Sequence, residues 1–126
     1  GKKLLNDLFI YNIESQVWTQ PQTKGKAPAP RQYHSAACIE DSLYLFGGYH
    51  GQKWLNDMVI LDMKQMCWKY PAVDGQAPKG KEGHAMERMG KLLYVYGGWD
   101  GDAVSDFHTF NTETLTWTKL RAIGDA

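Results

Sequence analysis

Residues 44–48 read YLFGG, and 50 positions later residues 94–98 read YVYGG. The tryptophans follow the same spacing, because Trp18 returns as Trp68 and then as Trp117, at offsets of 50 and 49 residues. Independent landmarks that share one period indicate a chain built from repeated structural units. The sequence therefore predicts a repeat architecture with a period of about 50 residues.

Further landmarks keep the same register. The recurring segments are LND at 5–7, LND at 55–57 and VSD at 104–106, and the recurring single residues are Pro28 and Pro78, His34 and His84. In the central unit the signature reads PRQYHSAA, SLYLFGGYHG and LNDMVILDMKQMCW. It resembles the Kelch repeat in its double glycine, its later aspartate and its spaced tryptophan. The G-x-A-P motif that precedes the arginine is similar to the one in Kelch proteins outside the BTB-domain group.

The resemblance covers nearly the whole chain and implies an all-β Kelch β-propeller fragment with four-stranded antiparallel blades. The strands of each unit, here called a to d, are expected where β-branched and aromatic runs lie between Gly, Asp, Asn and Ser. We predict strands a to d at 33–39, 43–47, 57–62 and 66–70, and again at 83–89, 92–97, 106–111 and 115–120. Strands c and d of the first unit are predicted at 7–12 and 16–20.

These strands divide the chain into blades. We expect a half blade at 1–20 with strands c and d, full blades at 21–70 and 71–120, and the start of the next connection at 121–126. A propeller needs about 4–8 blades. The ring is therefore expected to be incomplete, with the remaining blades supplied by a longer chain or by a companion protein.

The composition excludes several function classes. Lysine plus arginine and aspartate plus glutamate both number 14, so the formal charge is zero and a nucleic-acid or anionic-membrane partner is not expected. No apolar run is long enough to span a bilayer. With two cysteines and no N-x-S/T sequon, the sequence favours an intracellular, cytoplasmic or nuclear setting.

Most recurring residues are interpreted as structural. Glycine after strand b permits positive φ and the close approach of a neighbouring strand, which applies to Gly47, Gly48, Gly97 and Gly98. By resemblance to the family, the large recurring aromatics pack between blades: Trp18, Trp68, Trp117, Tyr44 and Tyr94.

Arg31 corresponds to the arginine of the family's P-R signature, whereas the next repeat has Lys81 and is expected to have lost that role. His34 and His84 are too few to form a zinc site, so we expect hydrogen-bonded structural histidines and no metal. Cys38 and Cys67 should lie on strands a and d, about 14 Å apart, and remain buried free thiols.

The long b–c and d–a loops emerge on one face, where non-recurring residues are free to serve recognition. The candidate partner-binding residues on this face are Gln32, Tyr49, His50, Lys53, Trp54, Trp99, Asp100 and Asp102. Trp54 is either an exposed anchor for a partner or a side chain that lies flat on the adjacent loop.

The resemblance implies a protein–protein interaction module of the adaptor, substrate-receptor or scaffold type, as in ubiquitin-ligase adaptors and cytoskeletal scaffolds. The alternatives are a purely architectural component of a large assembly, or an enzyme of the Kelch-propeller oxidase or lyase type with its site in other blades. No catalytic residue, cofactor or metal ligand is predicted in this chain, because no catalytic motif appears. The binding module is the leading hypothesis.

Overall fold

The computed structural model describes residues 8 and 10–120, and the regular secondary structure of this part of the chain consists of β-strands. A hairpin is formed by β1 (Ile10–Asn12) and β2 (Val17–Thr19). The central sheet contains, in spatial order, β3 (Ser35–Ile39), β4 (Ser42–Phe46), β5 (Met58–Asp62) and β6 (Cys67–Lys69). The C-terminal sheet contains β7 (Asp74–Gly75), β11 (Thr116–Leu120), β10 (Phe107–Asn111), β9 (Leu92–Tyr96) and β8 (Ala85–Met89).

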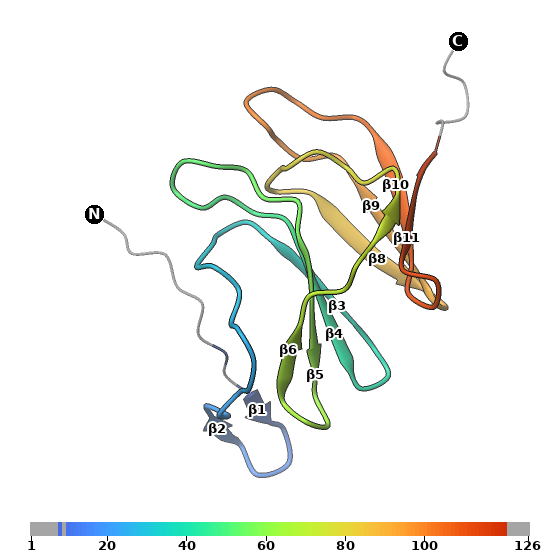
Figure 1. Ribbon diagram of the computed structural model, residues 1–126. Helices are drawn as coiled ribbons and strands as arrows, with labels where there is room; N and C mark the ends of the chain where they lie inside the picture. The colour runs from blue at the N-terminus through green and yellow to red at the C-terminus, as the bar shows by residue number, and fades with distance from the viewer. Residues whose placement is uncertain (1–7, 9, 121–126) are drawn as a thin grey trace.

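The two sheets fan out from a common inner edge (Figure 1). There β3 and β8, the first strands of their sheets, lie next to each other. Within the sheets, β3 to β6 and β8 to β11 pair antiparallel with their neighbours in sequence. The register repeats: Trp18 pairs with Tyr11, Trp68 with Leu61, and Trp117 with Phe110. The expected all-β fold with four-stranded antiparallel sheets is confirmed, and Trp68 and Trp117 occupy equivalent positions.

Side chains alternate between the two faces of each strand, and this alternation produces two hydrophobic cores. Tyr44 and Phe46 on β4 point towards the C-terminal sheet, where they meet Leu93, Phe110 and Trp117. The ring of Trp117 lies 5.0 Å from that of Phe46 and is 2% exposed. Full burial of an aromatic side chain of this kind stabilises a fold by about 1.5–3 kcal/mol, so this contact joins the sheets strongly.

On the opposite side of β4, Leu45 packs with Val59, Leu61 and Trp68, next to Leu8 from the N-terminal segment. Trp18 holds the same repeat position on the hairpin but is 66% exposed. Trp117 therefore packs between the two sheets, whereas Trp68 packs against its own sheet and Leu8.

The strands of the full blades lie within two residues of their predicted ends. Parts of the prediction fall outside the described residues, namely the LND segment 5–7, the beginning of strand 7–12 and the connection 121–126. β7 was not predicted. It pairs in parallel with β11, and Lys24 forms an isolated parallel bridge with Cys67 on β6 in the same manner. The d–a loop thus covers the outer edge of the next sheet and satisfies its edge hydrogen bonds.

The two cysteines lie on the edge strands β3 and β6 and neither is in a disulfide. The prediction that both are buried is wrong for Cys38, which is exposed, whereas Cys67 is half-buried. The reason is the position of β3, because alternate residues of this inner edge strand point away from both cores. In the part of the chain that the structure describes, no helix is long and apolar enough to cross a membrane.

Candidate functional site

The loop face is the side of the sheets from which the long loops 47–57 and 97–106 project, together with the connections 20–34 and 70–84. In Figure 1 the two b–c loops lie at the top of the view and the short turns lie at the opposite ends of the strands. The loop backbones are hydrogen-bonded to each other. Tyr49 exchanges two backbone hydrogen bonds with Gln32, at 2.8 and 3.1 Å, and Trp99 exchanges two with Glu82, at 2.8 and 3.0 Å.

The double glycine sets the distance between the sheets. Gly47 and Gly48 have φ values of 72° and 105°, which L side chains rarely adopt. A Cβ atom on Gly47 would lie 2.6 Å from Cε1 of His84 and 2.9 Å from the Lys81 carbonyl oxygen. The Gly48 amide donates to that same carbonyl at 2.8 Å. The glycines therefore allow the next sheet to approach the end of β4.

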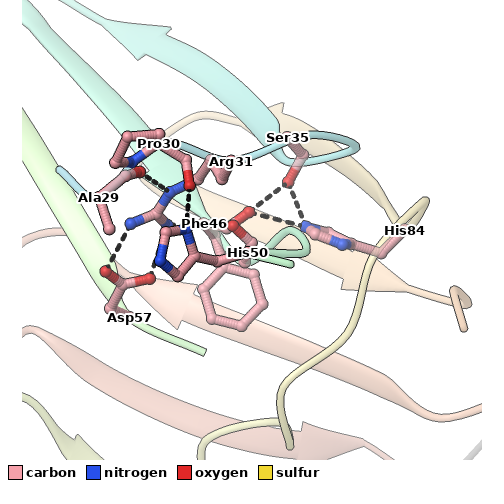
Figure 2. Close-up of polar contacts among 9 residues, drawn as sticks. Ala29, Pro30, Arg31, Ser35, Phe46, His50, Asp57 and His84 are labelled. Carbon is pink, nitrogen blue, oxygen red and sulfur yellow. Dashed lines mark hydrogen bonds and ion pairs between the residues drawn. The ribbon is translucent and has the colours of Figure 1, made fainter. Parts of the chain in front are cut away.

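Arg31 joins the d–a connection to the end of the b–c loop (Figure 2). Its guanidinium group donates to both carboxylate oxygens of Asp57, at 2.7 and 2.9 Å, and to the Gly47 carbonyl at 3.0 Å. Lys81, the repeat equivalent, is also buried and forms one 3.4 Å ion pair with Asp106. Burial lowers the pKa of Lys81, and the carboxylate of Asp106 opposes this shift. The second repeat has therefore kept the ion pair and lost the bidentate geometry, so the expectation that it had given up the role is wrong in part.

His84 connects the two sheets, as Figure 2 shows. Its Nε2 lies 3.0 Å from the Phe46 carbonyl oxygen and 2.5 Å from Ser35 Oγ. A carbonyl oxygen only accepts, so Nε2 carries the proton of the neutral ring. Burial, reinforced by the charge of Lys81, lowers the pKa of His84 to about 4. His34, at the same repeat position, is exposed. No group of three or more potential metal ligands occurs among the described residues.

Several candidate recognition residues instead hold the loops together. Trp54 is half-buried, and its Nε1 donates to Glu82 Oε1 at 3.0 Å. Its ring lies 5.4 Å from that of Tyr49, whose hydroxyl donates to the Gly51 carbonyl. Nδ1 of His50 lies 2.5 Å from the Pro30 carbonyl oxygen. Trp54 therefore contacts the neighbouring loops through Glu82 and Gly101, which favours the packing alternative.

The other candidates are distributed over the same face. Lys53 and Asp102 are exposed, whereas Gln32 and Asp100 are half-buried. One oxygen of Asp102 accepts the amide hydrogen of Ala103 at 2.9 Å. Trp99 differs from Trp54 because 49% of its surface is exposed although its backbone is fixed on both sides.

Trp99 lines a shallow, open pocket of about 480 Å³ between the two blades, together with Tyr33, Glu82, Gly83 and Gly98. Tyr33 and Glu82 were not among the predicted partner-binding residues. A signal was present, because their repeat equivalents are Gly83 and Gln32, so neither residue recurs. Trp54 and His50 share this property, because their repeat equivalents are Val104 and Asp100.

Residues 1–126 match the family described as the KLHDC2/KLHL20/DRC7 Kelch-repeats domain. The chain belongs to the Kelch-repeat family. The repeated sheets, the double glycines and the spaced tryptophans are thus the Kelch signature in three dimensions.

Curated relatives match shorter parts of this Kelch chain. They are a Rho GTPase-activating protein, gacHH, of Dictyostelium discoideum, 52% identical over 48 residues; the leucine-zipper-like transcriptional regulator 1 homolog of Drosophila melanogaster, 41% identical over 51 residues; and human host cell factor 2, 42% identical over 45 residues. These segments cover 38%, 40% and 36% of this chain, but only 3%, 5% and 6% of the respective relatives. The similarity therefore extends over about one Kelch repeat, and it carries no information on the activities of the full-length relatives.

Proposed function

We propose that this Kelch chain is a non-catalytic protein-interaction module that presents its loop face to a protein or peptide partner. The observation that carries the proposal is the combination of exposed aromatic rings with a fixed loop backbone. Trp99 is half-exposed while its own amide and carbonyl are both hydrogen-bonded to Glu82. A recognition surface that is ordered before binding loses less entropy when the partner arrives.

The opposite face offers less to a partner. Its turns are short, and the side chains of Asp62 and Asn111 accept hydrogen bonds from the backbone of the residues that follow them. The exposed ion pairs there, such as Lys64 with Asp41, are worth only about 0–1 kcal/mol in folded proteins. The loop face has the larger reach and the larger aromatic area, and aromatic anchors dominate the energetics of most interfaces.

The second candidate is a permanent architectural contact, in which the same face is buried in an assembly. It would bury more than about 2,000 Å², beyond the size of a standard reversible interface. We further propose an intracellular, cytoplasmic or nuclear location, supported by the balanced charge and the two free thiols. The neutral formal charge also argues against a nucleic-acid partner, since phosphate contacts require a cationic surface.

The test compares two faces in the intact protein. Trp99→Ala should weaken binding to a purified partner by about 2 kcal/mol or more, which is about 30-fold, if the indole is an anchor. Lys64→Ala, in a turn of the opposite face, should leave affinity within about twofold. Calorimetric titration measures both. If the Trp99→Ala variant binds normally and the Lys64→Ala variant does not bind, the interface lies on the turn face and the proposal is wrong.

A further inference from the structure

We infer that the pocket between Tyr33 and Trp99 receives a cationic side chain, arginine or lysine, from the partner. This inference rests on the proposed function and assigns the chemistry of one contact within it. The pocket combines two exposed aromatic walls with a carboxylate that has no cationic partner among the described ion pairs.

The walls come from different blades. Tyr33 precedes β3 of the central sheet and is 63% exposed, while Trp99 follows β9 of the C-terminal sheet and is 49% exposed. The amide of Gly83 donates to the Tyr33 carbonyl at 2.8 Å, which fixes the two blades at the pocket. Aromatic faces attract ammonium and guanidinium groups by about 0.5–1 kcal/mol at exposed sites and more when the site is desolvated.

Glu82 supplies the negative charge. It is half-buried, lines the pocket, and accepts one side-chain hydrogen bond, from the indole of Trp54 at 3.0 Å. An indole N–H orients the carboxylate but does not neutralise it. Within the described residues no lysine or arginine forms an ion pair with Glu82, and the buried cations Arg31 and Lys81 are paired with Asp57 and Asp106.

The neighbouring loop adds two further carboxylates, although these line an adjacent pocket that also contains Lys79 and Lys119. Asp100 and Asp102 lie on the loop that carries Trp99, and among the described ion pairs neither has a partner. The charge in the pocket lining itself is that of Glu82, so a cation gains a carboxylate and two aromatic faces, whereas an acidic group meets a carboxylate. Charge complementarity thus selects a basic side chain over an acidic or neutral one.

Tyr33 provides the independent argument. It has a φ of 57°, at a position where the next repeat has Gly83 with a φ of 65°. A left-handed conformation costs an L-residue roughly 1–2 kcal/mol. The exposed phenol ring contributes little packing to offset this cost, and the backbone hydrogen bond to Gly83 would survive replacement by glycine. Gln16, Glu40, Met66 and Leu115 also have positive φ, so the conformation is not specific to the pocket. What distinguishes Tyr33 is a large aromatic ring that stays 63% exposed at the pocket rim.

The experiment titrates capped pentapeptides into the intact protein and follows the indole N–H signal of Trp99 by NMR, assigned with Trp99→Phe. The probes are Gly-Gly-X-Gly-Gly with X as arginine, lysine, citrulline or glutamate. Citrulline keeps the shape of arginine without its charge. We expect the arginine peptide to bind about tenfold tighter than the citrulline peptide, and its affinity to fall with rising salt.

The variants separate charge from structure. Glu82→Gln keeps an oxygen for the Trp54 indole but removes the charge, so the arginine preference should fall to about twofold or less. Tyr33→Gly should weaken the arginine peptide about fivefold and leave the melting temperature unchanged or higher. Glu113→Gln removes the same charge from the turn face, where the carboxylate lies 3.2 Å from Lys91, and should leave the preference intact.

Equal binding of all four peptides, a preference for glutamate, or no shift of the Trp99 signal would each overturn the inference. Its failure can be told apart from failure of the proposed function. If Trp99→Ala weakens the purified protein partner while Glu82→Gln and the arginine peptide have no effect, the loop face binds a partner by other chemistry. If Trp99→Ala also leaves the partner unaffected, the proposed function fails as well.

Discussion

Arg31 and Lys81 show how one repeat position tolerates two residues of equal charge and unequal geometry. Arg31 makes a bidentate ion pair with Asp57 and also reaches the Gly47 carbonyl, whereas Lys81 makes one 3.4 Å contact with Asp106. A guanidinium group presents a planar fork of donors, and an ammonium group acts as a point charge. The sequence shows the exchange, but only the structure shows that the ion pair survives it.

Arg31→Lys should therefore destabilise the intact protein by about 1–3 kcal/mol, because a buried hydrogen bond to a charged group is lost and a carbonyl is left without its donor. Chemical denaturation measures this change. Arg88→Lys, on the exposed part of β8, is the matched control and should change the free energy of unfolding by less than about 0.5 kcal/mol. Equal effects of the two substitutions would contradict the role assigned to Arg31.

His84 predicts an acid-dependent loss of stability. Its pKa falls from 6.5 to about 4 in the folded protein, so the unfolded chain binds the proton more readily between these values. The stabilisation is complete above pH 6.5 and is lost as the pH falls towards 4, by up to about 3 kcal/mol at 1.36 kcal/mol for each pKa unit. Thermal unfolding across this range should show a shallower pH slope for His84→Gln. Burial also lowers the pKa of His108, so some slope should remain. An unchanged slope in the His84→Gln variant would contradict the assignment.

At the scale of the element, the strands of the full blades were predictable because β-branched and aromatic runs alternate with turn residues. β7 was not, because the segment around Asp74 and Gly75 lacks such a run. Its pairing depends on a neighbour distant in sequence, the edge of β11. The recurring glycine of the G-x-A-P segment, Gly25 and Gly75, was the available signal. The sequence likewise could not predict that Trp54 is half-buried and Trp99 exposed, because the burial of each indole depends on which loop lies opposite it.

Gly75→Ala should break this edge pairing. Gly75 has a φ of 92°, and a Cβ atom there would lie 2.0 Å from the carbonyl oxygen of Trp117. We expect a loss of about 2–4 kcal/mol, from strain and displaced hydrogen bonds. Gly51→Ala is the matched control, since Gly51 has a φ of 66° but no atom within 4 Å of the Cβ position, and should cost only about 1 kcal/mol. Equal losses in urea denaturation would show that β7 does not stabilise the sheet.

At the scale of the whole molecule, stability comes from sheets packed against sheets. One side of the C-terminal sheet is exposed, although the equivalent side of the central sheet is buried. Tyr96 is 41% exposed and stacked on Phe107, whereas its repeat equivalent, Phe46, is fully buried. Repeat proteins derive much of their stability from such interfaces. We therefore expect another sheet to cover this side in the intact protein.

Paired substitutions test that expectation. Phe46→Ala removes a ring that contacts both Trp117 and His84 and should cost about 3–5 kcal/mol. If a further sheet covers Tyr96, Tyr96→Ala should cost at least about 2 kcal/mol in the intact protein. A loss below about 0.5 kcal/mol, with the expected loss for Phe46→Ala, would mean that this side faces solvent.

Lys53 and Lys64 allow a direct test of whether the loop face binds a protein partner. Both are exposed lysines, one on the b–c loop of the loop face and one in a turn of the opposite face. Each is replaced in turn, in the intact protein, by photoreactive p-benzoylphenylalanine, and the covalent products formed on irradiation in cells are measured. Partner cross-links are expected from position 53, reduced by Trp99→Ala, and none from position 64. Cross-links from position 64 alone would contradict binding at the loop face.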